Sequence, residues 1–242
     1  MSMRLNGVGR MKNSEQAVKR ILRPPSVANW VSHNHRRLDK TKNGLLRFAQ
    51  VPPKHSLGGV YSICEAIVTD RISFEQAMKC VDGIRHPLTR AAAREIIPVF
   101  YSYAQSSHLD GLPTFKDFRS PYPIGRTIDG STITVPVVPT FTILSEGKPT
   151  PVFMIGWASR QLTSYQKRLL STVVHNAILT QQDFMGSNAL IVRTPRSKLT
   201  NTRIINDWWV RDFPFLTDHE LHDQFQRYGQ AVTEVVRTLR GE

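Results

Sequence analysis

The chain has 242 residues, of which 40% are hydrophobic and 21% are charged, and its formal net charge at pH 7 is +13. This composition supplies material for one large core or two modest ones, and it excludes a wholly disordered protein. The longest apolar run, residues 151–158, has the length of a strand. Because a membrane-spanning helix needs roughly 18 apolar residues, we expect no such helix.

The start of the chain and its two cysteines indicate a cytoplasmic protein. Residues 1–22 are basic and polar and lack the apolar stretch that a secretory signal requires, so we expect no export by that route. Cys64 and Cys80 have neither the spacing of a metal site nor that of a disulfide framework. We expect both cysteines to be reduced and to serve in packing.

Most of the positive charge lies in the first fifth of the chain. Residues 1–54 contain twelve Lys and Arg against two acids, a net charge of +10, whereas residues 55–242 contain twenty against seventeen, a net charge of +3. Such a block is typical of a segment that binds a polyanion, nucleic acid before an anionic membrane surface. The alternative is a solvated arm that only aids solubility.

The sequence therefore predicts a basic arm that binds nucleic acid, either DNA or RNA. The candidate binding residues are Arg20, Arg23, Trp30, Arg36, Arg37, Lys40, Lys42 and Arg47. Trp30 lies among cations, which favours stacking on unpaired bases, and burial in a core is the other interpretation of this ring. Since the arm has a polar composition, we expect the rest of the chain to fold without it.

Helical patterns dominate residues 55–110. Ser73 and Gln76 form a capping box that opens a helix. A second helical pattern covers residues 89–105 and contains Pro98, which predicts a kink or a break. We expect the two helices to pack together.

From residue 111 onward, turn residues and β-branched runs predict a sheet. Strands are expected at about residues 132–144 and 151–158, with a hairpin signal at Asp129-Gly130 before the first. The next elements expected are a helix from the capping box at Thr163, a short strand at residues 189–192 and a last helix from the capping box at Thr217.

These patterns together predict a mixed α/β protein with three parts. The parts are a basic arm over residues 1–54, a small helical region over residues 55–110 and a sheet-containing domain over residues 111–242. In the last part we expect a central mixed sheet flanked by helices, with the last helix packed on it.

The order helix, strand, strand, helix, strand over residues 88–193 resembles the core of the PD-(D/E)XK nuclease fold, the restriction-endonuclease-like fold. In that family a proline-acid pair closes one strand, an acid-x-lysine triplet lies on the next, and a helix and a strand follow. The matching segments here are residues 138–141 and 152–159. They place Thr140 at the metal-binding acid, Ile155 at the second acid and Trp157 at the lysine.

This resemblance implies a scaffold that does not cleave. In the family the two acids hold a divalent metal ion, and the lysine stabilises charge that develops on the phosphate. A chain that lacks all three should not cut nucleic acid. The resemblance therefore implies a degenerate member that serves in nucleic-acid binding or in assembly, with no catalytic residue, metal ligand or cofactor assigned.

Two alternatives remain open. An active metal-dependent nuclease would use Asp129, Glu146 and Lys148, since Glu146-Gly147-Lys148 matches acid-x-lysine, although a glycine turn is a poor support for a metal site. A structural interaction subunit would instead hold a protein partner through Trp208, Trp209 or the C-terminal helix, with burial in the core as the competing interpretation of the two rings.

Overall fold

The computed structural model describes residues 5–51, 53, 55–113 and 118–241, with side chains from residue 14 onward. The α-helices are α1 (Leu5–Leu22), α2 (Val27–His33), α3 (Leu38–Gln50), α4 (Gly58–Thr69), α5 (Phe74–Asp82), α6 (Pro87–Ser106), α7 (Ser164–Val174) and α8 (Asp218–Arg240). The strands are β1 (Asp110–Gly111), β2 (Ser120–Arg126), β3 (Thr132–Val137), β4 (Phe141–Ser145), β5 (Lys148–Ile155), β6 (Leu190–Arg193) and β7 (Asn206–Trp209). In this part of the chain, no helix combines the length and the apolar character that crossing a membrane would require.

Local sequence signals start three of these helices where they were expected. Ser73, Thr163 and Thr217 each accept a hydrogen bond from the third residue of the helix that follows, and the side chain at that position bonds back to the cap. These reciprocal bonds satisfy backbone donors that a helix end otherwise leaves free. Pro98 lies inside α6, and the helix continues past it to Ser106. The expected packing of α5 against α6 is confirmed.

The sheet is mixed and has five strands in the order β1-β4-β5-β6-β7. β5 and β6 pair in parallel, with α7 as the crossover between them, and the other neighbouring pairs are antiparallel. β2 and β3 form a separate two-stranded sheet that ends in the turn containing Asp129 and Gly130. The expected hairpin is thus confirmed, and the fold class is mixed α/β.

One strand expected from the sequence is in fact two. The stretch of residues 132–144 divides into β3 and β4, which belong to different sheets. Pro139 lies in the break between them. Proline has no backbone N–H to donate to a strand ladder, so a break at this position is favourable. The prediction of one continuous strand was therefore wrong.

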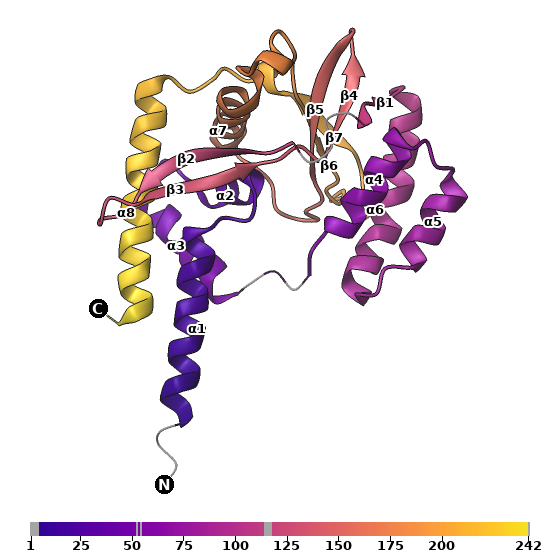
Figure 1. Cartoon of the computed structure of the whole chain (residues 1–242). Coiled ribbons are helices and arrows are strands. Elements are labelled where there is room, and N and C mark those ends of the chain that lie inside the picture. Colours follow the sequence, from indigo (N-terminus) through magenta and orange to yellow (C-terminus); the bar gives the residue numbers. More distant parts are fainter. Residues whose placement is uncertain (1–4, 52, 54, 114–117, 242) are drawn as a thin grey trace.

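Helices cover both faces of the five-stranded sheet (Figure 1). On one face, Val152, Met154 and Val192 pack in a hydrophobic cluster with α4, α5 and α6. On the other face, Phe153, Ile155 and Ile191 pack in a second cluster with α7. The alternation along β5 follows from the period of two that a strand imposes on its side chains.

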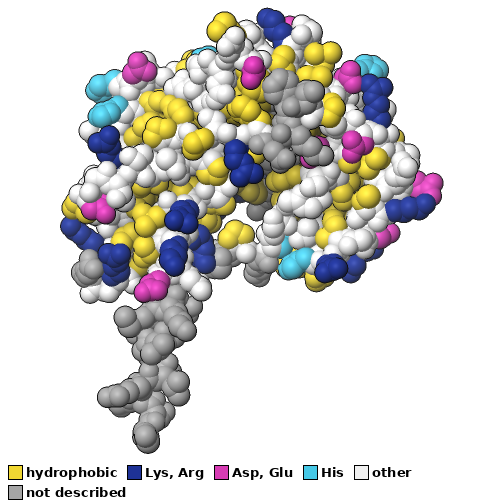
Figure 2. Space-filling model, in the orientation of Figure 1, with side chains coloured by type: hydrophobic (Ala, Val, Ile, Leu, Met, Phe, Trp, Pro, Cys, Tyr) yellow, Lys and Arg dark blue, Asp and Glu magenta, His cyan; other side chains and the backbone are white. Residues whose placement is uncertain are grey.

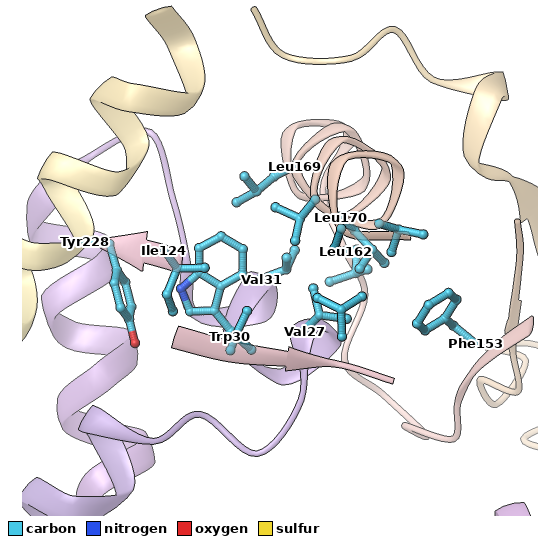
Figure 3. Packing of buried hydrophobic residues seen from close by; sticks show 14 of the residues in the cluster. Val27, Trp30, Val31, Ile124, Phe153, Leu162, Leu169, Leu170 and Tyr228 are labelled. Carbon is cyan, nitrogen blue, oxygen red and sulfur yellow. The ribbon is translucent and has the colours of Figure 1, made fainter. Parts of the chain in front are cut away.

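The first helices of the chain belong to the second of these clusters. α1 and α3 pack against α8, and α2 packs against α7. Their buried apolar side chains are Ala17, Ile21, Val27, Trp30, Val31, Leu45 and Ala49. Figure 3 shows Trp30 and Val31 between the side chains of α7 and Tyr228 of α8. The expectation that residues 1–54 offer little to a core was wrong, because apolar residues at helical spacing alternate with the charges.

A buried polar network fixes how α2, α7 and α8 sit together. Gln224 donates to Asn34 Oδ1 at 2.6 Å, and Asn34 donates to the carbonyl of Trp30 at 2.6 Å. Gln166 of α7 donates to the carbonyls of Ser32 and Asn34 at 3.1 and 3.0 Å. Because buried polar groups are costly when they are left without partners, this network strongly favours one arrangement of the three helices.

A glycine in α8 sets the distance between that helix and β2. A Cβ atom placed on Gly229 would lie 2.3 Å from the backbone oxygen of Arg126. We expect Gly229→Ala to lower the free energy of unfolding by about 1–3 kcal/mol, because the two backbones would have to separate. Gly59→Ala in α4 is the matched control, since a Cβ there meets nothing within 4 Å, and it should leave stability unchanged or raise it. Urea denaturation measures the free energy of unfolding of both variants, and an equal decrease in the two would contradict this role of Gly229.

Candidate nucleic-acid interface

Arg160 lies in the loop between β5 and α7, where the fold brings it against α2. Its Nη1 donates to Ser32 Oγ at 2.7 Å and lies 3.4 Å from His33 Nε2. The guanidinium carbon lies 5.4 Å from the centre of the Trp157 ring, a distance typical of a cation–π contact. These contacts hold the guanidinium in one place. Burial, and then the charge of Arg47, lower the pKa of Arg160.

Arg193 and Lys167 extend this group of cations along the end of β6. Arg193 is the last residue of β6, is only 4% exposed, and donates from Nη2 to the carbonyl of Arg160 at 2.7 Å. Its buried Nε has no hydrogen-bond partner in the described part of the chain. Lys167 Nζ lies 4.7 Å from the ring centre of Trp208. Burial, and then the charge of Arg193, lower the pKa of Lys167.

We call these four cations, Arg47, Arg160, Lys167 and Arg193, the Arg160 cluster. No carboxylate forms an ion pair with any of them within the residues that the structure describes. Within the cluster, Arg47 acts on Arg160, and Arg193 on Lys167, as like charges that repel. An anion placed at the cluster would relieve this repulsion, so its electrostatics complement a phosphate group.

His33 adds no charge to the Arg160 cluster at neutral pH. Burial, followed by the charges of Arg160 and His35, lowers the pKa of His33 to about 3. The ring is therefore neutral at pH 7, which lets Nε2 accept from Arg160. The histidine then acts as a polar support for the guanidinium, and phosphate attraction comes from the arginines and the lysine.

A pocket of about 270 Å³ opens beside the cluster, between α2, α4 and the end of β5. Thr140, Ile155 and Trp157 all line this pocket. The backbone N–H of Met154 donates to Thr140 Oγ1 at 2.9 Å, which ties the start of β4 to β5. The fold thus brings together the three positions of the nuclease resemblance, although Thr140 precedes β4 rather than closing a strand.

The acids and the lysine of the alternative nuclease site do not come together. Asp129 lies in the turn of the β2–β3 hairpin, whereas Glu146 and Lys148 lie at the turn between β4 and β5 of the other sheet. The two sets line separate pockets. Within the residues that the structure describes, no three His, Cys, Asp or Glu side chains form a group that could hold a metal ion. The structure therefore does not bring Asp129 together with Glu146 and Lys148.

The prediction that Trp30 stacks on unpaired bases was wrong. It is 1% exposed and contacts the rings of Phe225 and Tyr228 at centroid distances of 6.2 and 5.8 Å. Figure 3 shows Trp30 and Tyr228. A ring enclosed on all sides cannot stack on a base. The core interpretation of Trp30 is the one that the structure supports.

The seven basic residues expected to bind nucleic acid have different environments. Arg37 pairs with Asp39 and Lys42 with Glu234, and Arg20 donates to the carbonyl of Ala49 at the end of α3. The Arg36 guanidinium lies over the Tyr165 ring at 5.1 Å. Within the described residues, the exposed side chains without an ion-pair partner include Arg23, Lys40 and Arg47. Of all these residues, the structure brings Arg47 to Arg160.

Lys and Arg side chains also gather over the C-terminal part of α8 and the adjoining end of α1 (Figure 2). The exposed cations in or next to these elements include Lys19, Arg23, Arg237 and Arg240. The Arg160 cluster differs in that hydrogen bonds hold Arg160 and that Arg193 is buried. A surface of exposed cations attracts a polyanion at long range, whereas a guanidinium held in one place also fixes the position of a bound phosphate.

The aromatic pair near the C-terminus belongs mainly to the protein interior. Trp208 is 6% exposed and packs edge-on against Phe213, and Trp209 is half-buried at the margin of the α4–α6 cluster. The apolar face of α8, including Tyr228 and Val232, is buried as well. Trp208 and this face of α8 are therefore not accessible to a protein partner, and burial in the core is the interpretation of Trp208 that the structure supports.

Three residues of the Arg160 cluster, Arg160, Lys167 and Arg193, were not among the binding residues that the sequence predicts. A signal was present in Trp157-Ala158-Ser159-Arg160, where an aromatic ring and a cation precede a capping box. Comparison of the chain with protein-family models, with curated proteins and with solved structures found no match.

Proposed function

We propose that the protein binds nucleic acid through the Arg160 cluster and does not cleave it. The observation that carries the proposal is the fixed arrangement of cations around Arg160 with no carboxylate partner in the described residues. Guanidinium groups suit phosphate oxygens because their N–H donors lie in a rigid fork. The excess of positive charge in residues 1–54 adds attraction at long range.

The chain order supports a degenerate nuclease-like scaffold for this function. β4, β5, α7 and β6 follow one another with a parallel β5–β6 pair, the order on which the resemblance rests, whereas β1 and the β2–β3 hairpin lie between α6 and β4. In this interpretation the pocket beside the cluster occupies the place of an active site, with Thr140, Ile155 and Trp157 in place of two acids and a lysine. We place the binding in the cytoplasm, where free Cys64 and Cys80 would stay reduced.

Charge reversal at matched sites tests the binding. Arg47→Glu should weaken binding to a labelled oligonucleotide by roughly tenfold at low salt, because the change removes a phosphate contact and adds a repulsion. Arg85→Glu is the control, because this substitution changes the net charge by the same amount. Arg85 is exposed on the α5–α6 connection, which belongs to the layer of helices on the other side of the sheet. Fluorescence anisotropy at two salt concentrations measures both. Equal losses of affinity, or no binding by the unaltered protein, would contradict the proposal.

The same complexes test the absence of cleavage. With magnesium or manganese added, labelled single-stranded and duplex DNA or RNA should remain at full length, because the described residues contain no group of three or more His, Cys, Asp or Glu side chains that could hold a metal ion. Cleavage that depends on metal and is abolished in Glu146→Gln would contradict this part of the proposal.

A further inference from the structure

We infer that the pocket between α2, α4 and the end of β5 takes one unstacked nucleobase, with cytosine favoured over uracil, while the adjoining phosphate lies at the Arg160 cluster. This inference rests on the proposed function and specifies its ligand as a single strand. Three features support it: the walls of the pocket, its polar groups and its position beside the cations.

The walls of the pocket suit a flat, weakly polar ring. Apolar side chains from three elements line it, and they include Val27 of α2, Phe153 of β5 and Pro139 before β4. Trp157, half-buried, supplies an aromatic ring at the margin. A base with an exposed π-face stacks on such a ring irrespective of its sequence, which is how single-strand binding proteins hold unpaired bases.

The polar groups of the pocket are able to read the edge of a base. Tyr61 Oη accepts from the backbone N–H of Gly156 at 3.0 Å, which leaves the hydroxyl proton free to donate. Burial raises the pKa of Tyr61 to about 12, so the hydroxyl keeps that proton at neutral pH. Ser62 and Glu65 lie on the same face of α4 as Tyr61 and also line the pocket.

Glu65 provides the expected selectivity. It is the one charged residue among the described residues that line the pocket, and it has no ion-pair partner within the described chain. A carboxylate accepts from the exocyclic amino group of cytosine and repels the carbonyl oxygen that uracil carries at the same position. It also repels phosphate, which places the backbone outside the pocket, on the side of the cations.

The Arg160 cluster begins where the pocket ends. Trp157 lines the pocket, and the Arg160 guanidinium lies 5.4 Å from the centre of its ring. Arg160 also contacts Ser32 of α2, the helix whose first residues form another wall of the pocket. One nucleotide can therefore place its base against Trp157 and its phosphate at Arg160.

The first experiment compares oligonucleotides with and without bases. The full-length protein should bind a labelled oligo-deoxycytidine at least about fivefold more tightly than a backbone of the same length built from abasic residues, because an abasic strand cannot stack. Trp157→Ala should remove most of this difference, because the base then has no aromatic ring at the margin of the pocket to stack on. Equal affinity for the two oligonucleotides would overturn the inference while leaving the proposed function intact. Absence of binding to either would overturn both.

The second experiment tests Glu65 and does not depend on removal of a large ring. The unaltered protein should prefer oligo-deoxycytidine to oligo-deoxyuridine by about fivefold or more, and Glu65→Gln, which keeps the size of the side chain, should reduce that preference. Glu75→Gln on α5, outside the pocket, is the matched control and should keep it. No preference in the unaltered protein, or a preference that survives in Glu65→Gln, would contradict the role of Glu65.

Discussion

Deletion of residues 1–54 should abolish cooperative folding. The deletion would remove seven buried apolar side chains of α1–α3 from the core and expose the face of α8 that they cover. Each of the larger aliphatic side chains among them contributes about 1.5–3 kcal/mol, and a typical domain has only about 5–15 kcal/mol of net stability. The remaining chain would keep α4–α6 and the sheet but would lack one wall of the second core.

Urea denaturation followed by circular dichroism measures this effect. A truncation of residues 1–13 is the control and should keep a cooperative transition, because it stops before Ala17, the first core residue among the described side chains of α1. A fragment of residues 55–242 that unfolds cooperatively at the same urea concentration as the full chain would contradict the account of the core.

Trp30→Ala should lower the free energy of unfolding by about 3–5 kcal/mol. The ring is 1% exposed and packs against Phe225 and Tyr228, and its Nε1 has no hydrogen-bond partner in the described residues. The destabilisation therefore comes from packing and from the cavity that is left. Because the ring of Trp157 is only half-buried, Trp157→Ala should cost less than half as much. Urea denaturation measures the change in the free energy of unfolding for both variants. A decrease below about 1 kcal/mol for Trp30→Ala would contradict the place of this ring in the core.

The sequence predicted elements whose causes are local. The capping boxes at Ser73, Thr163 and Thr217 start helices, and the Asp129-Gly130 turn joins two strands, because these structures depend on residues close together in the chain. The division of residues 132–144 into two strands was missed. Its cause is partly distant, since β3 pairs with β2 and β4 pairs with β1 and β5.

The place of α1–α3 was missed because charge hides their apolar positions. Ile21, Trp30 and Leu45 each have basic residues within a few positions, and the net charge of +10 over residues 1–54 suggests a segment held by a polyanion. α3, for example, buries Leu45 and Ala49 on one face and exposes Lys40 and Arg47. Composition averages over the two faces, whereas packing depends on each separately.

The candidate site was predicted only in part, for a related reason. Arg47 was chosen because it lies in the basic segment, and the three aligned positions do meet in one pocket. Arg160 and Arg193 are 33 residues apart and meet through a hydrogen bond to a carbonyl, an interaction that depends on the parallel pairing of β5 and β6. No local pattern indicates such an interaction, so the cluster emerges only from the fold.

The salt dependence of nucleic-acid binding tests the central claim most directly. For a single-stranded oligonucleotide, each phosphate that the protein neutralises contributes about 0.7 to the slope of log affinity against log salt. The double variant Arg47→Ala, Arg160→Gln should therefore have a slope shallower than that of the unaltered protein by about 1.4. The control variant Arg85→Ala should have the same slope as the unaltered protein. A double variant whose slope equals that of the unaltered protein would contradict binding through the Arg160 cluster.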